Sequence, residues 1–324
     1  MLPPDTAPAS APDDAVARQP DGPAWLDAVV ARGSITDGSW PLVCGLALTQ
    51  RLAAVRAAAL ACRTPDAVAD ALFRADPASV DAVWNALAAG QLPCGHRLRA
   101  RLLDAAPDAV GDLAVRSLAL CDARCPDRSR IDALYALGRL RLAGGRDVAQ
   151  RIAAAGPPPP LAAHATPDVA ARYADAYRAW VYAQWALSRI DARAGAETAL
   201  ATLRRLPVPE GSITLPGVIH DDPERGAGDP ASDLCGILAG NDTAETRALL
   251  WQLAGDETVS VGARQRALLT LARLGDARAS GEGLARNPLT ADQAAVVAGA
   301  LDGARTGRPA GGATGGGHHR HHWH

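Results

Sequence analysis

The histidines at the end of the printed sequence are the residues whose type and spacing come closest to metal chemistry. Five of the eight histidines fall within its last seven residues: His318, His319, His321, His322 and His324. Neutral imidazole is a good ligand for Ni, Zn and Cu, and several rings on one short segment can chelate an ion together. We hypothesise a metal-capturing tail. An expression tag and a low-complexity tail that binds nothing are the open alternatives.

A second possible metal site combines cysteines with one histidine. Cys94 and His96 are followed along the chain by Cys121 and Cys125. Three thiolates and one imidazole make up a tetrahedral zinc set. The Cys-x-His and Cys-x-x-x-Cys spacings differ from those of established zinc motifs, and free cysteine often serves as a small buried apolar residue. A structural zinc site and ordinary core cysteines are therefore both open.

Aromatic residues gather on one predicted helix, residues 167–194, which holds five of the twelve in the chain. At 100° per residue, one broad apolar face forms, and we expect it to pack in the core. Its members are Val169, Tyr173, Tyr177, Trp180, Val181 and Leu187.

The polar face of the same predicted helix is a candidate protein-binding site. Tyr182 lies on this face with Arg178 and Arg189, and Trp185 lies at its margin. An exposed Tyr–Trp pair flanked by arginines has the composition of a protein-binding hot spot. Packing of both rings on a neighbouring helix is an equal alternative. Burial of both rings would remove the contact-site interpretation.

Patterns typical of catalysis are missing from the sequence. It contains no recognisable Ser-His-Asp set, no glycine-rich phosphate loop that opens a helix, and no carboxylate pair at catalytic spacing. The segment His220-Asp221-Asp222, together with Asp229 and Asp233, could bind a metal or another cation. It lacks the tight ligand spacing of a cation site, so we expect a solvated acidic loop. The sequence favours a protein without enzymatic activity and leaves that question open.

Composition predicts the class of fold. The 324 residues include 73 alanines and a single phenylalanine, and aromatic residues make up 4% of the chain. Alanine is the strongest helix former, whereas the residues that favour strands are scarce. We therefore expect an all-α protein. A length of this size is typical of about two domains.

Charge and hydropathy exclude several classes of partner. The net charge is −2, which argues against a broad nucleic-acid surface. No uninterrupted apolar run approaches the ~18 residues that span a bilayer, and no secretory signal is recognisable. Six cysteines are too few for a disulfide scaffold. We expect a cytoplasmic protein that binds neither nucleic acid nor membrane.

Proline–aspartate pairs indicate where helices begin. They start at Pro65, Pro107, Pro126 and Pro167, because proline lacks an N–H that would be unpaired there and aspartate complements the helix dipole. The first two prolines are 42 residues apart and the last two 41, a spacing typical of two-helix repeats. Thr290 to Gln293 predicts a capping box.

These signals, together with glycines that end helices, predict a train of helices joined by short connections. Their ranges are 40–62, 65–75, 77–89, 94–106, 107–122, 127–143, 146–155, 167–194, 196–206, 232–239, 243–254, 257–274, 276–286 and 290–303. Short connections make neighbours antiparallel. One pair cannot bury its own apolar stripe, so we expect an α-solenoid of stacked antiparallel pairs.

Proline and glycine content predicts how the chain is divided. We expect a disordered lead, a helical lobe, an irregular loop, a second helical lobe, and a glycine-rich linker with the histidine tail. The ranges are 1–22, 23–206, 207–231, 232–302 and 303–324.

The segment from Ala263 to Ala279 resembles the second helix and closing turn of a HEAT-like repeat, and Ile131 to Leu140 is similar. Leu137-Gly138 with Gly145 and Ala149 suggests a tetratricopeptide-like unit as the second choice. Either resemblance implies a curved helical stack that binds another protein, and neither implies a reaction. We expect a non-enzymatic scaffold for protein–protein interaction. The alternative is a metal-handling accessory protein that captures Ni, Zn or Cu with its tail.

Overall fold

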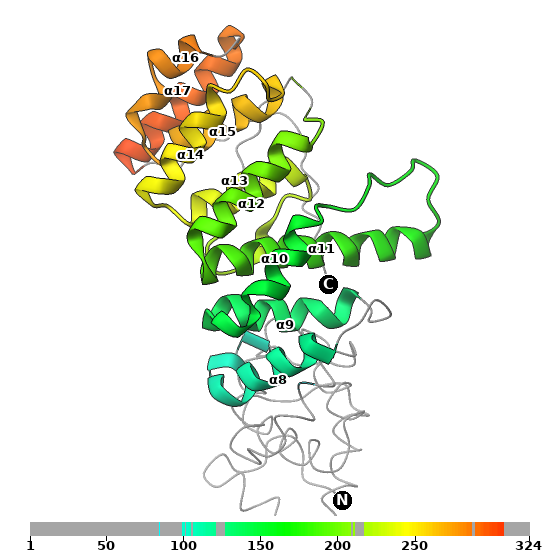
Figure 1. Cartoon of the computed structure of the whole chain (residues 1–324). Coiled ribbons are helices and arrows are strands. Elements are labelled where there is room, and N and C mark those ends of the chain that lie inside the picture. The colour runs from blue at the N-terminus through cyan, green and yellow to red at the C-terminus, as the bar shows by residue number, and fades with distance from the viewer. Residues whose placement is uncertain are drawn as a thin grey trace, which may run out of the picture. The chain divides into compact units, whose positions relative to one another are not determined.

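The computed structural model is described for residues 84, 99–100, 102–104, 106–120, 127–208, 210, 217–286 and 289–307. Within these ranges there are α-helices α8 to α17, short 3-10 helices and no strand (Figure 1). The predicted all-α class is confirmed for this part of the chain. By its contacts the chain divides into two compact units, residues 1–140 and 141–324, and each is described by itself.

The first unit contains α8 (Pro107–Leu120) and α9 (Asp127–Leu140), which pack against each other. Each begins at a Pro–Asp signal, since Asp108 and Asp127 lie in the first turns. In α8 the buried side chains Val110, Ala114 and Leu118 recur every four residues, as one apolar face requires. In α9 burial extends around the helix, because Ile131 and every residue from Ala133 to Leu137 are buried.

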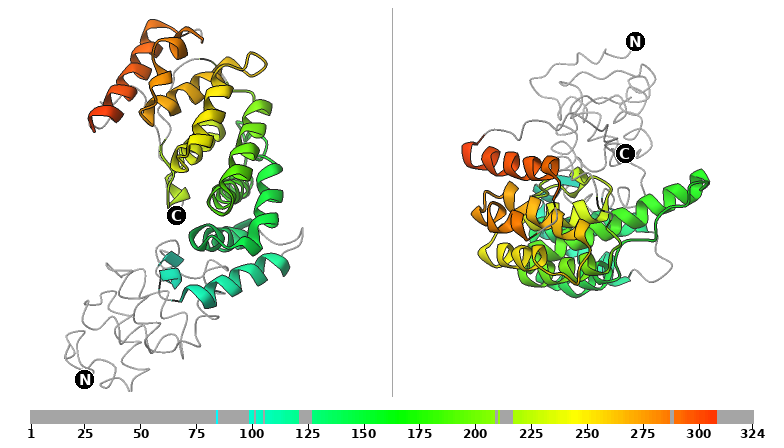
Figure 2. Two further views of the ribbon diagram at one scale, coloured as in Figure 1. Left: turned by 60° about the vertical axis from the view of Figure 1, so that its left-hand side comes forward. Right: turned by 90° about the horizontal axis from the view of Figure 1, so that it is seen from above.

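The second unit begins with η2 (Ala143–Gly145), α10 (Arg146–Ala154), α11 (Pro167–Ile190), α12 (Ala192–Arg205) and η3 (Pro223–Arg225). It continues with α13 (Pro230–Gly240), α14 (Ala244–Ala254), α15 (Val261–Arg273), η4 (Ala277–Ala279), α16 (Glu282–Ala285) and α17 (Ala291–Thr306). The helices lie in two rows (Figure 2). In one row α10 packs on α12 and α12 on α14; in the other α11, α13, α15 and α17 pack in succession.

Local capping explains where the helices of the second unit begin. The residue before each of six helices places a side-chain oxygen on a backbone N–H of the first turn, which satisfies a donor that lacks a helical partner. These caps are Thr166, Asp191, Asp229, Thr243, Ser260 and Thr290. The predicted capping box at Thr290 is confirmed, because the Gln293 side chain also accepts a hydrogen bond from the Thr290 backbone N–H.

Several predicted helices differ from the structure by a few residues at one end, and two of the differences have a clear local cause. The helix expected over 167–194 ends at Ile190, since Asp191 has an extended backbone and caps α12 instead. The helix expected over 276–286 is broken into η4 and α16. Gly281 adopts a left-handed backbone with φ 51° between them, which a helix cannot continue through.

The core of the second unit lies along α11 and α15. Every residue of α11 from Tyr177 to Ser188 is buried, as is most of α15. Small residues let the helices approach closely. A Cβ placed on Gly195 of α12 would lie 2.5 Å from the Cα of Ser188 in α11, so only glycine fits there.

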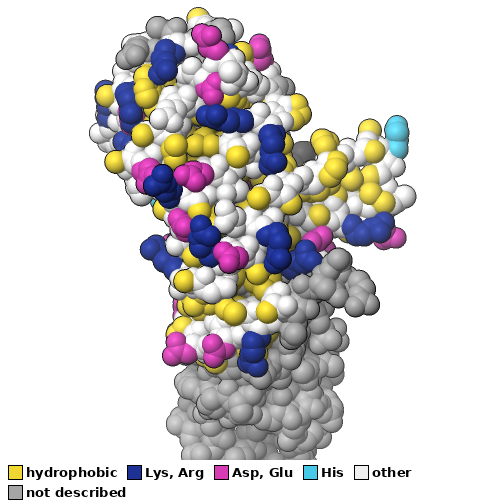
Figure 3. All heavy atoms as spheres, viewed as in Figure 1, with side chains coloured by type: hydrophobic (Ala, Val, Ile, Leu, Met, Phe, Trp, Pro, Cys, Tyr) yellow, Lys and Arg dark blue, Asp and Glu magenta, His cyan; other side chains and the backbone are white. Residues whose placement is uncertain are grey.

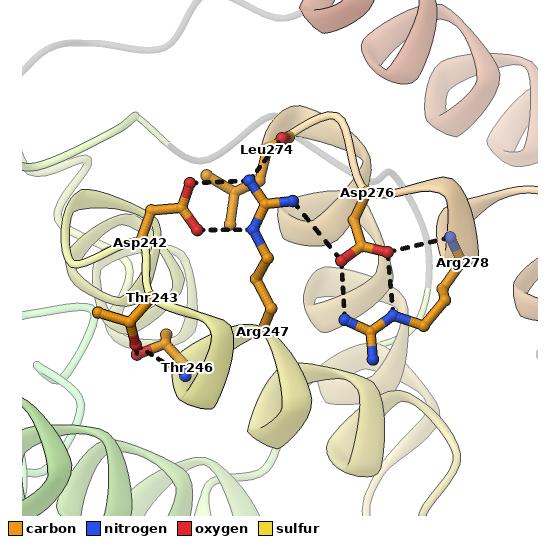
Figure 4. A network of polar contacts seen from close by, with 7 residues as sticks. All are labelled: Asp242, Thr243, Thr246, Arg247, Leu274, Asp276 and Arg278. Carbon is orange, nitrogen blue, oxygen red and sulfur yellow. Dashed lines mark hydrogen bonds and ion pairs between the residues drawn. The ribbon is translucent and has the colours of Figure 1, made fainter.

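A network of arginines and aspartates joins α14 to the end of α15 (Figure 4). Nε of Arg247 donates to Asp242 at 2.7 Å, and Nη2 donates to the Leu274 carbonyl at 3.0 Å. Asp276 lies 3.7 Å from the Arg247 guanidinium and accepts from Arg278 at 2.8 Å. The network satisfies a carbonyl at the C-terminus of α15, where no helical donor is available.

The lead 1–22 and the tail 308–324 lie outside the described residues. None of the helices in the described part of the chain combines the length and apolar character that crossing a membrane requires. The segment 217–229, which contains η3, lies within the predicted irregular loop 207–231, and α13 begins at Pro230.

Candidate functional site

Both metal sites predicted from the sequence lie outside the described residues. They are the tail histidines His318, His319, His321, His322 and His324, and the set Cys94, His96, Cys121 and Cys125. In the described ranges, no group of three or more His, Cys, Asp or Glu side chains is arranged to hold a metal ion. The metal hypotheses therefore stay predictions.

Tyr182 and Trp185 are buried, which overturns the protein-binding alternative for this pair and leaves packing within the chain. Each of the two residues is 1% exposed. The segment containing η3 covers this face of α11: the Tyr182 hydroxyl donates to Glu224 at 2.5 Å, and Trp185 Nε1 donates to the His220 carbonyl at 2.7 Å. Helical periodicity places these residues on one face of the helix, but it carries no information about an irregular segment that packs on that face.

The two flanking arginines hold the same segment in place. Arg178 forms an ion pair with Glu224 and is buried. Arg189 donates to Asp221 at 3.0 Å, and its guanidinium lies 5.4 Å from the centre of the Trp185 ring. These four side chains fasten the η3 segment to α11. Tyr182, Trp185 and Arg178 are buried there, whereas Arg189 stays partly exposed.

A buried carboxylate in α13 forms the strongest polar cluster. Asp233 accepts from the backbone N–H groups of Ala227 at 2.5 Å and Gly228 at 3.1 Å, and from the Tyr177 hydroxyl. Burial raises the pKa of Asp233 to about 6. Burial, and then the charge of Asp233, raise the pKa of Tyr177 far above its ordinary value.

Perturbed pKa values often indicate active sites, but this cluster has no room for a substrate. The space lined by Tyr177, Arg178 and Asp233 measures about 10 Å³. A cavity needs roughly 10–15 Å³ to hold even one water molecule. We conclude that the cluster is a structural clasp that joins residues 226–228 to α11 and α13.

A larger cavity lies where α11 and α13 end and α12 begins. It has a volume of about 210 Å³ and is named here the Arg141 pocket. Trp185, Ile219 and Ile237, all buried, supply its apolar walls. The polar lining residues are Arg141, Ser188, Arg189, His220 and Asn241.

The Arg141 pocket carries an excess of positive charge. None of the residues known to line it is an aspartate or glutamate. Of the nearby carboxylates, Asp221 is paired with Arg189, and Asp191 accepts from Arg146 at 2.9 Å. Within the described part of the chain the guanidinium of Arg141 has no hydrogen bond or ion pair, and the residue is exposed. Arg141 is therefore the uncompensated charge.

The backbone of Arg141 is unusual. It has φ 52°, and among the described residues no other residue except glycine has a positive φ. The residue directly follows α9, a position where glycine commonly adopts the left-handed conformation. A side chain at such a φ costs roughly 1–2 kcal/mol. The chain thus places an arginine beside the pocket where glycine would be more stable.

The first half of α11 projects beyond the packed helices. We name residues 156–176, which comprise these helical turns and the loop before them, the α11 arm (Figure 1). Leu161 and Val169 are each 40% exposed, and within the described ranges they are the large hydrophobic residues that are exposed. Hydrophobic side chains run along the arm in Figure 3.

The arm corrects the expectation that the whole apolar stripe of α11 is core. Val169 and Tyr173 share that stripe with Tyr177 and Trp180, yet Val169 is exposed and Tyr173 is half-buried. Periodicity identifies the apolar stripe, but its burial depends on which helices pack against it. The helices α10, α12 and α13 contact α11, and the buried residues of α11 are concentrated in its second half.

Comparison of the chain with protein-family models, curated proteins and solved structures finds no match. The function is therefore argued from the α11 arm and the Arg141 pocket.

Proposed function

We propose that the chain is a non-enzymatic α-helical scaffold that binds another protein, and that the α11 arm is its contact element. The observation that carries the proposal is the contrast within one helix. The second half of α11 is buried, whereas the first half keeps an apolar face uncovered. Exposed apolar surface on a soluble protein marks sites of interaction with other proteins.

The arrangement of α10 to α17 supports the scaffold part of the proposal. The principal helix contacts in each row join successive members, and the rows pack on each other through α10–α11, α11–α12 and α14–α15. Such a pattern is expected of an α-solenoid, in which stacking hides the stripe that one pair leaves open. We propose a HEAT-like repeat arrangement for this unit.

The shape of the arm indicates what kind of surface it meets. A projecting helix is convex, and it buries most area when a partner's groove closes around it. A second copy of the chain would offer an equally convex arm and touch it along a line. Val169 and Tyr173 lie one turn apart on the helix, the spacing of anchors in helix-in-groove recognition. We therefore assign the arm to a partner protein with an apolar groove.

The base of the arm is held rigidly, which favours binding. Tyr173 stacks on Tyr177 with ring centres 6.2 Å apart, and the Tyr177 hydroxyl donates a hydrogen bond to Asp233. Trp180 Nε1 donates to the Ala153 carbonyl at 3.2 Å. A helix that is already formed and oriented loses little conformational entropy on binding, so more of the contact energy becomes affinity.

Site-specific photocrosslinking in cells tests the proposal. A photoreactive amino acid replaces Val169 in the full chain, and a matched chain carries it at Ala298, an exposed position on α17. We expect a discrete adduct with another protein from position 169 and not from position 298. The adduct identifies the partner, which is then purified.

Binding of the purified partner is measured to the unaltered chain, to Val169→Asp and to Ala298→Asp. We expect Val169→Asp to weaken binding by about ten-fold or more, since a buried charge without a partner is costly, and Ala298→Asp to leave it unchanged. Equal affinity of all three, or an adduct formed between two copies of this chain, would overturn the proposal.

A further inference from the structure

We propose that the Arg141 pocket binds a single carboxylate carried on a short apolar stem. A small aliphatic acid and the C-terminal residue of a peptide both have this chemistry. The site lies at the ends of α11 and α13 and shares no residue with the α11 arm, so it goes beyond the scaffold function and can be tested separately.

The size and walls of the pocket suit the apolar stem. Its volume of about 210 Å³ exceeds the ~150 Å³ of an engineered cavity that holds benzene. The walls contributed by Trp185, Ile219 and Ile237 are apolar and fixed by burial. An aliphatic side chain of about four carbons fits such a space, and its transfer from water into the pocket is favourable.

The charges at the pocket favour a ligand that carries a single negative charge. Arg189 is balanced by Asp221, so the net excess is the single guanidinium of Arg141. Guanidinium matches a carboxylate in a planar, two-bond arrangement. A phosphate group carries about 1.5–2 negative charges at neutral pH, which exceeds the charge available here.

Bare backbone carbonyls would repel an anion, and three of those around the pocket already have a hydrogen-bond donor. Asn241 Nδ2 donates to the Ser188 carbonyl at 3.3 Å. His220 Nδ1 lies 3.1 Å from the Gly240 carbonyl, and because a carbonyl only accepts, this nitrogen is the donor. The His220 carbonyl accepts from Trp185. At the ends of α11 and α13, the carbonyls of Ser188 and Gly240 are thus already paired with donors.

The test measures binding of N-acetyl-leucine, which carries a free carboxylate on an apolar residue, to the full chain by isothermal titration and ligand-observed NMR. Its uncharged counterpart is N-acetyl-leucine amide. Isovalerate represents a small acid, and inorganic phosphate represents a different anion. Arg141→Gln removes the charge but keeps a polar stem. Arg151→Gln, on the exposed surface of α10, is the matched control.

We expect saturable binding of N-acetyl-leucine, and affinities at least about ten-fold lower for its amide, for phosphate, and for N-acetyl-leucine with Arg141→Gln. Arg151→Gln and the arm variant Val169→Asp are expected to bind like the unaltered chain. Tighter binding of N-acetyl-leucine than of isovalerate identifies a peptide end as the source, and the reverse order identifies a small acid.

Three results would overturn the proposal: no binding of either acid at millimolar concentration, equal binding of acid and amide, or equal binding by Arg141→Gln and the unaltered chain. Circular dichroism of Arg141→Gln checks that the helices are intact. Failure of this test leaves the arm proposal standing, because the two depend on different residues.

Discussion

At the scale of single residues, Asp233 makes stability depend on pH. Its folded-state pKa is about 6, against 3.8 for the unperturbed group, because burial penalises the charged form. The folded protein therefore binds this proton more tightly than the unfolded chain does. The free energy of unfolding therefore falls by about 3 kcal/mol in total as the pH rises from about 4 to about 6.

Urea denaturation between pH 4 and pH 7 checks this prediction. Asp233→Asn cannot ionise, so its free energy of unfolding should lack this decrease, whereas Asp302→Asn, at an exposed position of α17, should keep it. The Arg278 guanidinium lowers the pKa of Asp276. The stability that this ion pair contributes is lost only below about pH 4, so it does not change the pH profile between pH 4 and pH 7. Parallel pH profiles for the unaltered chain and Asp233→Asn would contradict the assignment.

The left-handed backbone of Arg141 gives a second prediction at this scale. Arg141→Gly relieves the strain of φ 52° and should raise the free energy of unfolding by about 1 kcal/mol. The same change at Arg151, inside α10, should lower it by about 1 kcal/mol. Urea denaturation of both variants measures the contrast. A lower stability of Arg141→Gly would show that the arginine side chain stabilises the fold.

At the scale of helices, the α11–α12 contact depends on one glycine. Gly195→Ala places a Cβ against the backbone of Ser188, and we expect a loss of about 1–3 kcal/mol, as in overpacked cores. Gly299 in α17 has no atom within 4 Å of the same added Cβ, so Gly299→Ala should stabilise by up to about 1 kcal/mol. Thermal unfolding of the two variants should shift in opposite directions, and equal shifts would contradict the close approach.

Helices could be predicted from the sequence because their signals are local. Thr166 with Pro167, and Thr290 with Gln293, satisfy backbone donors within one turn, so their effect does not depend on the rest of the chain. The covering of Tyr182 by Glu224 joins residues 42 positions apart. Nothing in the periodicity of α11 indicates such a contact, so the sequence leaves exposure and burial of this face as equal alternatives.

The Arg141 pocket could not be predicted either, and for the same reason. Its lining comes from the ends of two helices, the start of a third and an irregular segment. No two of Arg141, Arg189 and His220 are close enough in sequence to form a motif. The helix predicted over 127–143 includes Arg141, whereas α9 ends at Leu140 and Arg141 has a left-handed backbone. The sequence therefore gives no signal that this arginine stands where a helix stops.

At the scale of the whole molecule, the division into residues 1–140 and 141–324 predicts two unfolding units. Gly195→Ala lies in the second unit. Hydrogen exchange should therefore accelerate in α11 and α12 while the amides of α8 and α9 keep their rates. Mass spectrometry of exchanged peptides measures this, and uniform acceleration along the chain would show that the units unfold as one.

The succession of contacts from α10 to α17 also has a mechanical meaning. Each helix makes its main contacts with the next helix in the chain or the one after it. Tension applied between Arg141 and Gly307 would therefore strain a few helix–helix interfaces at a time rather than all of them together. Such a body should yield in a series of small, separately reversible extensions, and would behave under load as a soft spring.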